Sequence, residues 1–319
     1  MDYDNGELMR PDETAQSGSH RKYVTYLSFI VAGVLLSFVV MWQTGEEVDE
    51  PPSALEIVRF LVIPVCGAHL AAKFLSDRRW RKSDYYVREA RWSVLTVAVL
   101  LVLYLVVPFL YPFVAAPRQY AVVSDEERLK WVVVSILTSF EVLAVGSLIV
   151  KMNGGGFLQS MGLTRGSYRR LMLVGVIAFL AFDPMRFIYQ TAVVRVFYAL
   201  GLPMEQHSVT EELQRPIGMD LRLVLIFEVI VEAPLFEEIF YRGFFYKALR
   251  KGMSARGAML LTALVFAMFH LSLLQICLVF PFGLLSAYLV ERSGSVVPCI
   301  TVHFLHNASV LIFFFLTAA

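Results

Sequence analysis

Long apolar runs separated by short polar stretches follow one another along almost the whole chain. Each is long enough, or nearly so, to cross the hydrocarbon core of a bilayer as a helix of about 20 residues. The nine runs lie near residues 23–43, 55–75, 93–115, 131–151, 171–192, 221–246, 255–271, 274–291 and 296–317. Because backbone groups in lipid must be hydrogen-bonded within the segment, we expect helices. The pattern predicts an all-α, polytopic integral membrane bundle of about nine transmembrane helices.

Composition agrees with a membrane protein and argues against a nucleic-acid partner. Of 319 residues, 57% are hydrophobic and 17% are charged, and the net charge is only +1. The cysteines Cys66, Cys277 and Cys299 lie in apolar runs without CxxC spacing, so we interpret them as small core side chains. Residues 1–20 are polar and lack the apolar core of a signal peptide, which predicts an N-terminal tail.

The charges of the loops predict an orientation. The stretches 76–91, 151–170 and 242–256 are rich in Lys and Arg, whereas 44–54 has four acidic residues and no basic one. Alternation over nine helices puts the basic stretches on one side together with the N-terminus. The positive-inside rule makes that side cytosolic. We therefore expect a cytosolic N-terminus and a C-terminus on the outer side.

Ionisable side chains inside the apolar runs are concentrated in the last third of the chain. An ionisable group within a bilayer is costly, so a functional role is the first hypothesis for such a residue. A polar bond between two helices is the alternative. These residues are Glu228, Glu232, Glu237, Glu238, His270, His303 and His306, with Asn307 beside them.

Their spacing indicates which of them face one another. Glu238 and Arg242 are four residues apart and can pair on one helix face, whereas Glu237 points roughly 100° away from that face. His303 and Asn307 are also four residues apart, so both face one space. Counted from the nearest predicted cytosolic basic residue, which for Glu237 is Lys247, the three helices bring Glu237, His270 and His303 to depths of roughly 15–21 Å.

These residue types fit the hydrolysis of an amide bond. A glutamate removed from water is a stronger base and suits the activation of a water molecule. A histidine opposite it can pass the proton to the leaving amine, and a second histidine with an asparagine amide can donate to an oxyanion. The same side chains could instead bind zinc, with Glu237, His270 and His303 as ligands, although no HExxH motif is present.

Three motifs in this part of the chain resemble those of the CPBP family, which contains CAAX prenyl endopeptidases, bacteriocin-processing enzymes and ABI-domain proteins. "EEIFYR" is an EExxxR motif, "FAMFH" is an FxxxH motif and "HFLHN" is an HxxxN motif. The resemblance covers roughly 215–317 and implies an intramembrane glutamic endopeptidase without a metal cofactor. It assigns water activation to Glu237 with His270 beside it, and oxyanion stabilisation to His303 and Asn307. Glu238 and Arg242 become a supporting pair, and Phe266 shapes the pocket.

The resemblance also implies a division of the chain into two parts and a set of partners. Residues 201–319 form the catalytic helical core, and 21–200 hold five transmembrane helices of unassigned role. The expected partners are membrane lipids and a peptide or membrane-protein substrate, which is prenylated in part of the family.

Two other function classes remain open. A non-catalytic binding or immunity protein of the same fold would keep the helices without the reaction. A proton-coupled transporter would also bury Glu and His, but it usually shows related halves, and here the polar groups occupy one third of the chain. Glu228 and Glu232 are expected either to bond neighbouring helices or to line a water path to Glu237.

Overall fold

The computed structural model describes residues 90, 92–106, 124–164, 166–204 and 208–317, and the regular structure within these ranges is entirely helical. The polar tail at 1–20 and the predicted helices at 23–43 and 55–75 lie outside the described residues. Contacts divide the chain into two compact units: of the described residues, Leu180–Ile188 belong to one and the rest to the other.

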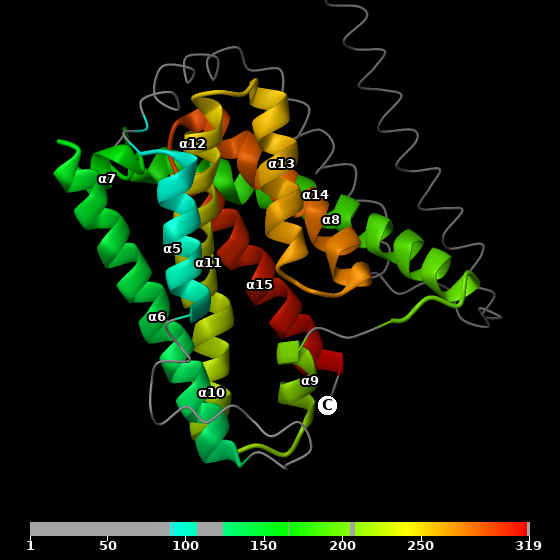
Figure 1. The fold of residues 1–319 in the computed structure, drawn as a ribbon. Coiled ribbons are helices and arrows are strands. Elements are labelled where there is room, and N and C mark those ends of the chain that lie inside the picture. The colour runs from blue at the N-terminus through cyan, green and yellow to red at the C-terminus, as the bar shows by residue number, and fades with distance from the viewer. Residues whose placement is uncertain (1–89, 91, 107–123, 165, 205–207, 318–319) are drawn as a thin grey trace, which may run out of the picture. The chain divides into compact units, whose positions relative to one another are not determined.

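The observed helices follow the predicted apolar runs and extend several of them by a turn (Figure 1). The N-terminal half of the described chain holds α5 Val94–Val106, α6 Asp125–Met152, α7 Phe157–Ser160, α8 Tyr168–Ala199 and α9 Ser208–Gln214. The C-terminal half holds α10 Met219–Phe227, η4 Glu228–Glu232, α11 Ala233–Glu237, η5 Glu238–Phe245, α12 Tyr246–Arg250, α13 Ala255–Met268, α14 Leu273–Ser293 and α15 Val297–Thr317.

Four of these helices, α6, α8, α14 and α15, are long and apolar enough to cross a membrane. Helices α5 and α13 are apolar but shorter in the described residues. Large apolar side chains on the outside of the bundle, such as Leu223, Phe227 and Leu235, are exposed as lipid-facing residues would be. The described part of the chain is all-α and has helices suited to an integral membrane protein, and the total of nine crossings remains a prediction.

Residues 219–250 run without a break through α10, η4, α11, η5 and α12, and we call this run the motif helix. Two of its segments, η4 and η5, are π-helical, which means that each turn holds an extra fraction of a residue. Pro234 lies in the first turn of α11, between these two segments, where it also lacks an N–H for the helix ladder. Wide turns of this kind are rare and occur mostly at functional sites.

The end of the bundle that contains α7 and α12 also contains the junction of α14 and α15. The Val296 N–H donates to the Met161 carbonyl at 3.2 Å, and a Cβ on Gly162 would collide with the Gly294 backbone. The Lys247 ammonium donates to the Ser160 carbonyl. The predicted placement of 151–170 and 242–256 on one side therefore agrees with the fold, whereas the basic stretch 76–91 is almost wholly outside the described residues.

The basic stretch 242–256 is not the exposed loop that its charges predict. Arg242, Lys247 and Arg250 lie inside the motif helix and are 0–3% exposed. The Arg250 guanidinium forms two hydrogen bonds of 3.0 Å with the Glu291 carboxylate, and the Tyr246 hydroxyl donates to the same carboxylate at 2.8 Å. Lys247 therefore has a protein partner in place of solvent, and the depth of roughly 15 Å counted from it for Glu237 remains a prediction.

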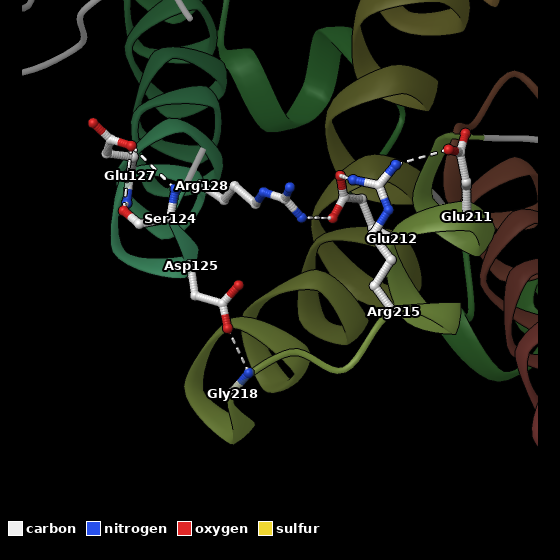
Figure 2. A network of polar contacts seen from close by, with 8 residues as sticks. All are labelled: Ser124, Asp125, Glu127, Arg128, Glu211, Glu212, Arg215 and Gly218. Atoms are coloured by element: carbon white, nitrogen blue, oxygen red, sulfur yellow. Dashed lines mark hydrogen bonds and ion pairs between the residues drawn. The ribbon is translucent and has the colours of Figure 1, made fainter. Parts of the chain in front are cut away.

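At the other end of the bundle, polar contacts join the first turn of α6 to α9 and to the start of α10 (Figure 2). Ser124 and Glu127 form a capping box at the start of α6, which satisfies N–H groups that have no partner in the helix. Asp125 accepts a hydrogen bond of 2.7 Å from the Gly218 N–H, and Arg128 contacts Glu212 of α9 at 2.6 Å. These contacts fix where α10 begins.

Candidate active site

The centre of the candidate site is a buried ion pair within the motif helix. Glu238 Oε2 and Arg242 Nε are 3.2 Å apart, and both side chains are 0% exposed. The guanidinium also donates from Nη2 to the Gly283 carbonyl of α14 at 3.2 Å and lies 4.3 Å from the centre of the Phe266 ring of α13. Arg242 therefore fixes the Glu238 carboxylate and contacts two neighbouring helices.

His303 of α15 lies between the two adjacent glutamates. Its Nδ1 is 2.9 Å from Glu238 Oε1, and its Nε2 is 3.9 Å from Glu237 Oε2. The hydrogen bond with Glu238 fixes the ring, so the opposite nitrogen faces Glu237. The Glu237 side chain is 27% exposed, whereas the His303 side chain is 7% exposed. The accessible carboxylate is therefore Glu237, and the buried groups orient its partner.

Aromatic rings enclose this cluster. The Phe266 ring meets Tyr241 edge to face at 5.1 Å and His303 at 6.2 Å. Phe282 of α14 packs against His303 at 4.8 Å and against His306 at 5.2 Å. The rings exclude water from the buried ion pair and hold the imidazole of His303 in place.

His270 and Asn307 are attached to the cluster less directly. His270 lies just beyond α13, where its ring is 5.5 Å from that of Phe266 and its Nδ1 is 3.3 Å from the Phe266 carbonyl. The Asn307 amide donates to the Val229 carbonyl at 2.8 Å. Val229 lies within η4, so this amide bonds to the wide turn that precedes Glu237.

The structure thus brings most of the predicted residues into one cluster. Its members are Glu237, Glu238, Arg242, Phe266 and His303. Phe282 and the Gly283 carbonyl belong to the same cluster, but sequence analysis missed them. An aromatic ring or a backbone carbonyl within an apolar run carries no distinctive signal, apart from the Pro281 that precedes both.

The alternative zinc site was predicted to use Glu237, His270 and His303. Among the residues that the structure describes, no three His, Cys, Asp or Glu side chains form a group that could hold a metal ion. His303 instead contacts the two glutamates.

Comparison with known proteins bears on the same part of the chain. Residues 220–309 match the family model described as "Type II CAAX prenyl endopeptidase Rce1-like". This match supports the assignment of the segment to the CPBP, or CAAX protease, family. The matched segment contains the motif helix from Asp220, all of α13 and α14, and α15 as far as Ser309. No curated protein and no solved structure matches the chain.

The match and the long apolar helices together support a membrane-embedded protein with a segment similar to a protease family. The three motifs that predicted it all lie within the matched residues. Most of the chain before 220 lies outside the match, and the division into a catalytic core at 201–319 and five preceding helices remains a prediction.

Proposed function

We propose that this chain is an intramembrane endopeptidase that hydrolyses a peptide bond with water activated by Glu237. The observation that carries the proposal is the position of His303, which bonds Glu238 through one ring nitrogen and faces Glu237 with the other. An accessible carboxylate beside an oriented imidazole is the arrangement that general acid–base catalysis needs.

Each side chain then has a defined part in the reaction. Glu237 takes a proton from water, the oxygen attacks the peptide carbonyl, and the proton passes to the nitrogen as the C–N bond breaks. His303, oriented by Glu238, donates from Nε2 to the oxyanion in its protonated form. Asn307 uses one amide N–H on Val229 and has a second for the oxyanion. We assign His270 the transfer of the proton to the leaving amine and Phe266 the shaping of the pocket.

The proposed substrate is a membrane-associated peptide or protein that carries a prenyl group. The family description names prenyl endopeptidases, and an apolar lipid on the substrate suits a site that is embedded in a bilayer. The proposed topology has nine crossings, with the N-terminus in the cytosol and the C-terminus on the outer side.

The proposal is tested by cleavage of a farnesylated CaaX-type peptide in proteoliposomes. Glu237→Gln keeps the shape of the side chain and removes the base, so turnover should fall by about 10²–10⁴-fold while the thermal unfolding curve is unchanged. Glu126→Gln, on the exposed first turn of α6, is the control and should retain full turnover. Normal cleavage by Glu237→Gln would refute the assignment of the base.

A further inference from the structure

Two more glutamates of the motif helix take no part in the proposed reaction. Glu228 and Glu232 are the first and last residues of η4. Glu232 is only 7% exposed, and its Oε1 atom has no hydrogen-bond partner among the residues that the structure describes. Because buried polar atoms in proteins are nearly always hydrogen-bonded, often to ordered water, this oxygen calls for a solvent partner.

Glu228, Glu232 and Glu237 together form what we call the acidic strip. Glu232 interacts electrostatically with the other two carboxylates and with the Ser139 side chain of α6. Tyr104 of α5 interacts with all three glutamates and stacks on Phe236 at 4.8 Å. Polar groups from three helices therefore face the strip. Carboxylates so close together repel one another strongly unless water separates them or protons neutralise them.

The two ends of the strip differ in packing. Beyond Glu237 the motif helix is closed by aromatic side chains: Phe240, Tyr241, Phe244 and Tyr246 are 0–6% exposed. In the opposite direction, Glu228, Val229, Ile230 and Val231 are partly exposed, and Glu232 is buried. This difference favours entry of water from the Glu228 end over entry from the α12 end.

At the Glu228 end, α9 packs over the motif helix. Leu213 of α9 belongs to a buried cluster with Leu221, Leu225 and Leu311, and Val229 and Ile230 pack against that cluster. One ion pair holds α9 in this position (Figure 2): Arg128 of α6 contacts Glu212 of α9 at 2.6 Å. The apolar cluster around Leu213 thus lies next to the acidic strip, and α9 forms one side of this cluster.

We propose that water reaches Glu237 along the acidic strip from the Glu228 end, and that α9 closes this end. Hydrolysis of one peptide bond consumes one water molecule: its oxygen joins the carbonyl carbon, the C–N bond breaks, and both protons end on the leaving amine as an ammonium group. The strip supplies this water. The use of this water in catalysis rests on the proposed function. The presence of water along the acidic strip does not depend on that function.

The test is chemical labelling in proteoliposomes, which needs no enzyme activity. Glu232→Cys is made in a background with Cys66→Ala, Cys277→Ala and Cys299→Ser and treated with a permanently cationic methanethiosulfonate. This reagent enters only hydrated regions, and the remaining carboxylates attract it. We expect Cys at position 232 to be modified, and Cys at the exposed, lipid-facing position 235 in Leu235→Cys to remain unmodified.

Absence of labelling at position 232, in protein that is fully labelled after denaturation, would show a dry strip and overturn the proposal. Ser139→Cys gives a second reporter on α6, so the result does not depend on whether the Glu232 variant folds. If position 232 is labelled but the parent protein has no peptidase activity, the acidic strip is hydrated and only the proposed function is refuted.

The role of α9 is tested by adding Arg128→Ala to the labelled variant. Loss of the Arg128–Glu212 ion pair should loosen α9 and speed labelling at position 232 by about two- to fivefold, as expected for a partly exposed ion pair. Lys130→Ala, which removes an exposed pair with Glu126 on the same helix, is the matched control and should not change the rate. Equal rates in both variants would show that α9 does not close the strip.

Discussion

Removal of Arg242 should separate the structural role of the buried ion pair from the chemistry of Glu237. The Glu238 carboxylate is 0% exposed in the parent chain, and in Arg242→Ala it loses the guanidinium that lies 3.2 Å away. It must then remain as an uncompensated buried charge or become protonated. The variant also loses the hydrogen bond to Gly283 and the contact with the Phe266 ring, which join the motif helix to α14 and α13.

The expected loss is about 3–5 kcal/mol in the free energy of unfolding, the usual cost of deleting one partner of a buried pair. The double variant Glu238→Gln with Arg242→Met should recover most of this loss, because replacing both charges of a buried pair is often close to neutral. The Gln side-chain oxygen can still accept from His303 Nδ1. A stable double variant would therefore allow the orientation of His303 to be tested without the ion pair.

The assay is reversible unfolding of the purified protein in mixed detergent micelles, with peptide cleavage measured in parallel. Lys130→Ala is the control, since Lys130 and Glu126 have the same i,i+4 spacing but are 45% and 77% exposed. That variant should unfold like the parent protein, because exposed pairs contribute little. If Arg242→Ala is as stable as Lys130→Ala, the Glu238–Arg242 pair is solvated, and the inference that it fixes Glu238 is wrong.

Three further predictions concern the metal, the α13–α14 turn and the topology. Peptide cleavage should survive a strong chelator; loss of cleavage with rescue by added zinc would make Glu237 and His303 metal ligands. Leu271→Gly should raise stability by up to about 1 kcal/mol, because Leu271 is 90% exposed and has a left-handed φ of 58°, whereas Leu273→Gly, in the first turn of α14, should lower it. Cysteines placed at Ser83 and Ala319 should be labelled from opposite sides of the membrane, with only position 319 reactive from outside the cell.

Much of the fold could be predicted from the sequence because lipid imposes a simple rule. Each apolar run must satisfy its own backbone groups, so its length and position define a helix. The runs predicted at 131–151, 171–192 and 296–317 correspond closely to α6, α8 and α15. The pairing of Glu238 with Arg242 was also predictable, since i,i+4 neighbours on a helix contact each other whatever surrounds them.

The roles of the basic residues in the motif helix could not be predicted in the same way. The positive-inside rule treats Lys and Arg near a helix end as solvated, yet Lys247 and Arg250 are buried. Their partners, the Ser160 carbonyl and the Glu291 carboxylate, are 87 and 41 residues away in the chain. A single sequence does not reveal contacts at such separations. From sequence alone, a buried Lys or Arg with a distant partner cannot be distinguished from one in an exposed loop.

The π-helical turns explain why the arrangement of the candidate site also escaped prediction. Helical geometry of 3.6 residues per turn directs Glu237 away from the Glu238–Arg242 face, which is correct, but it does not say that one histidine reaches both glutamates. The wider turns of η4 and η5 flank Glu237 on both sides. In η4 the Val229 carbonyl accepts a hydrogen bond from the Asn307 amide. In η5 the Phe244 carbonyl accepts one of 2.9 Å from the Trp92 indole N–H. Side chains from other helices thus bond to backbone carbonyls of both wide turns, so the geometry around Glu237 depends on tertiary contacts and not on the local sequence.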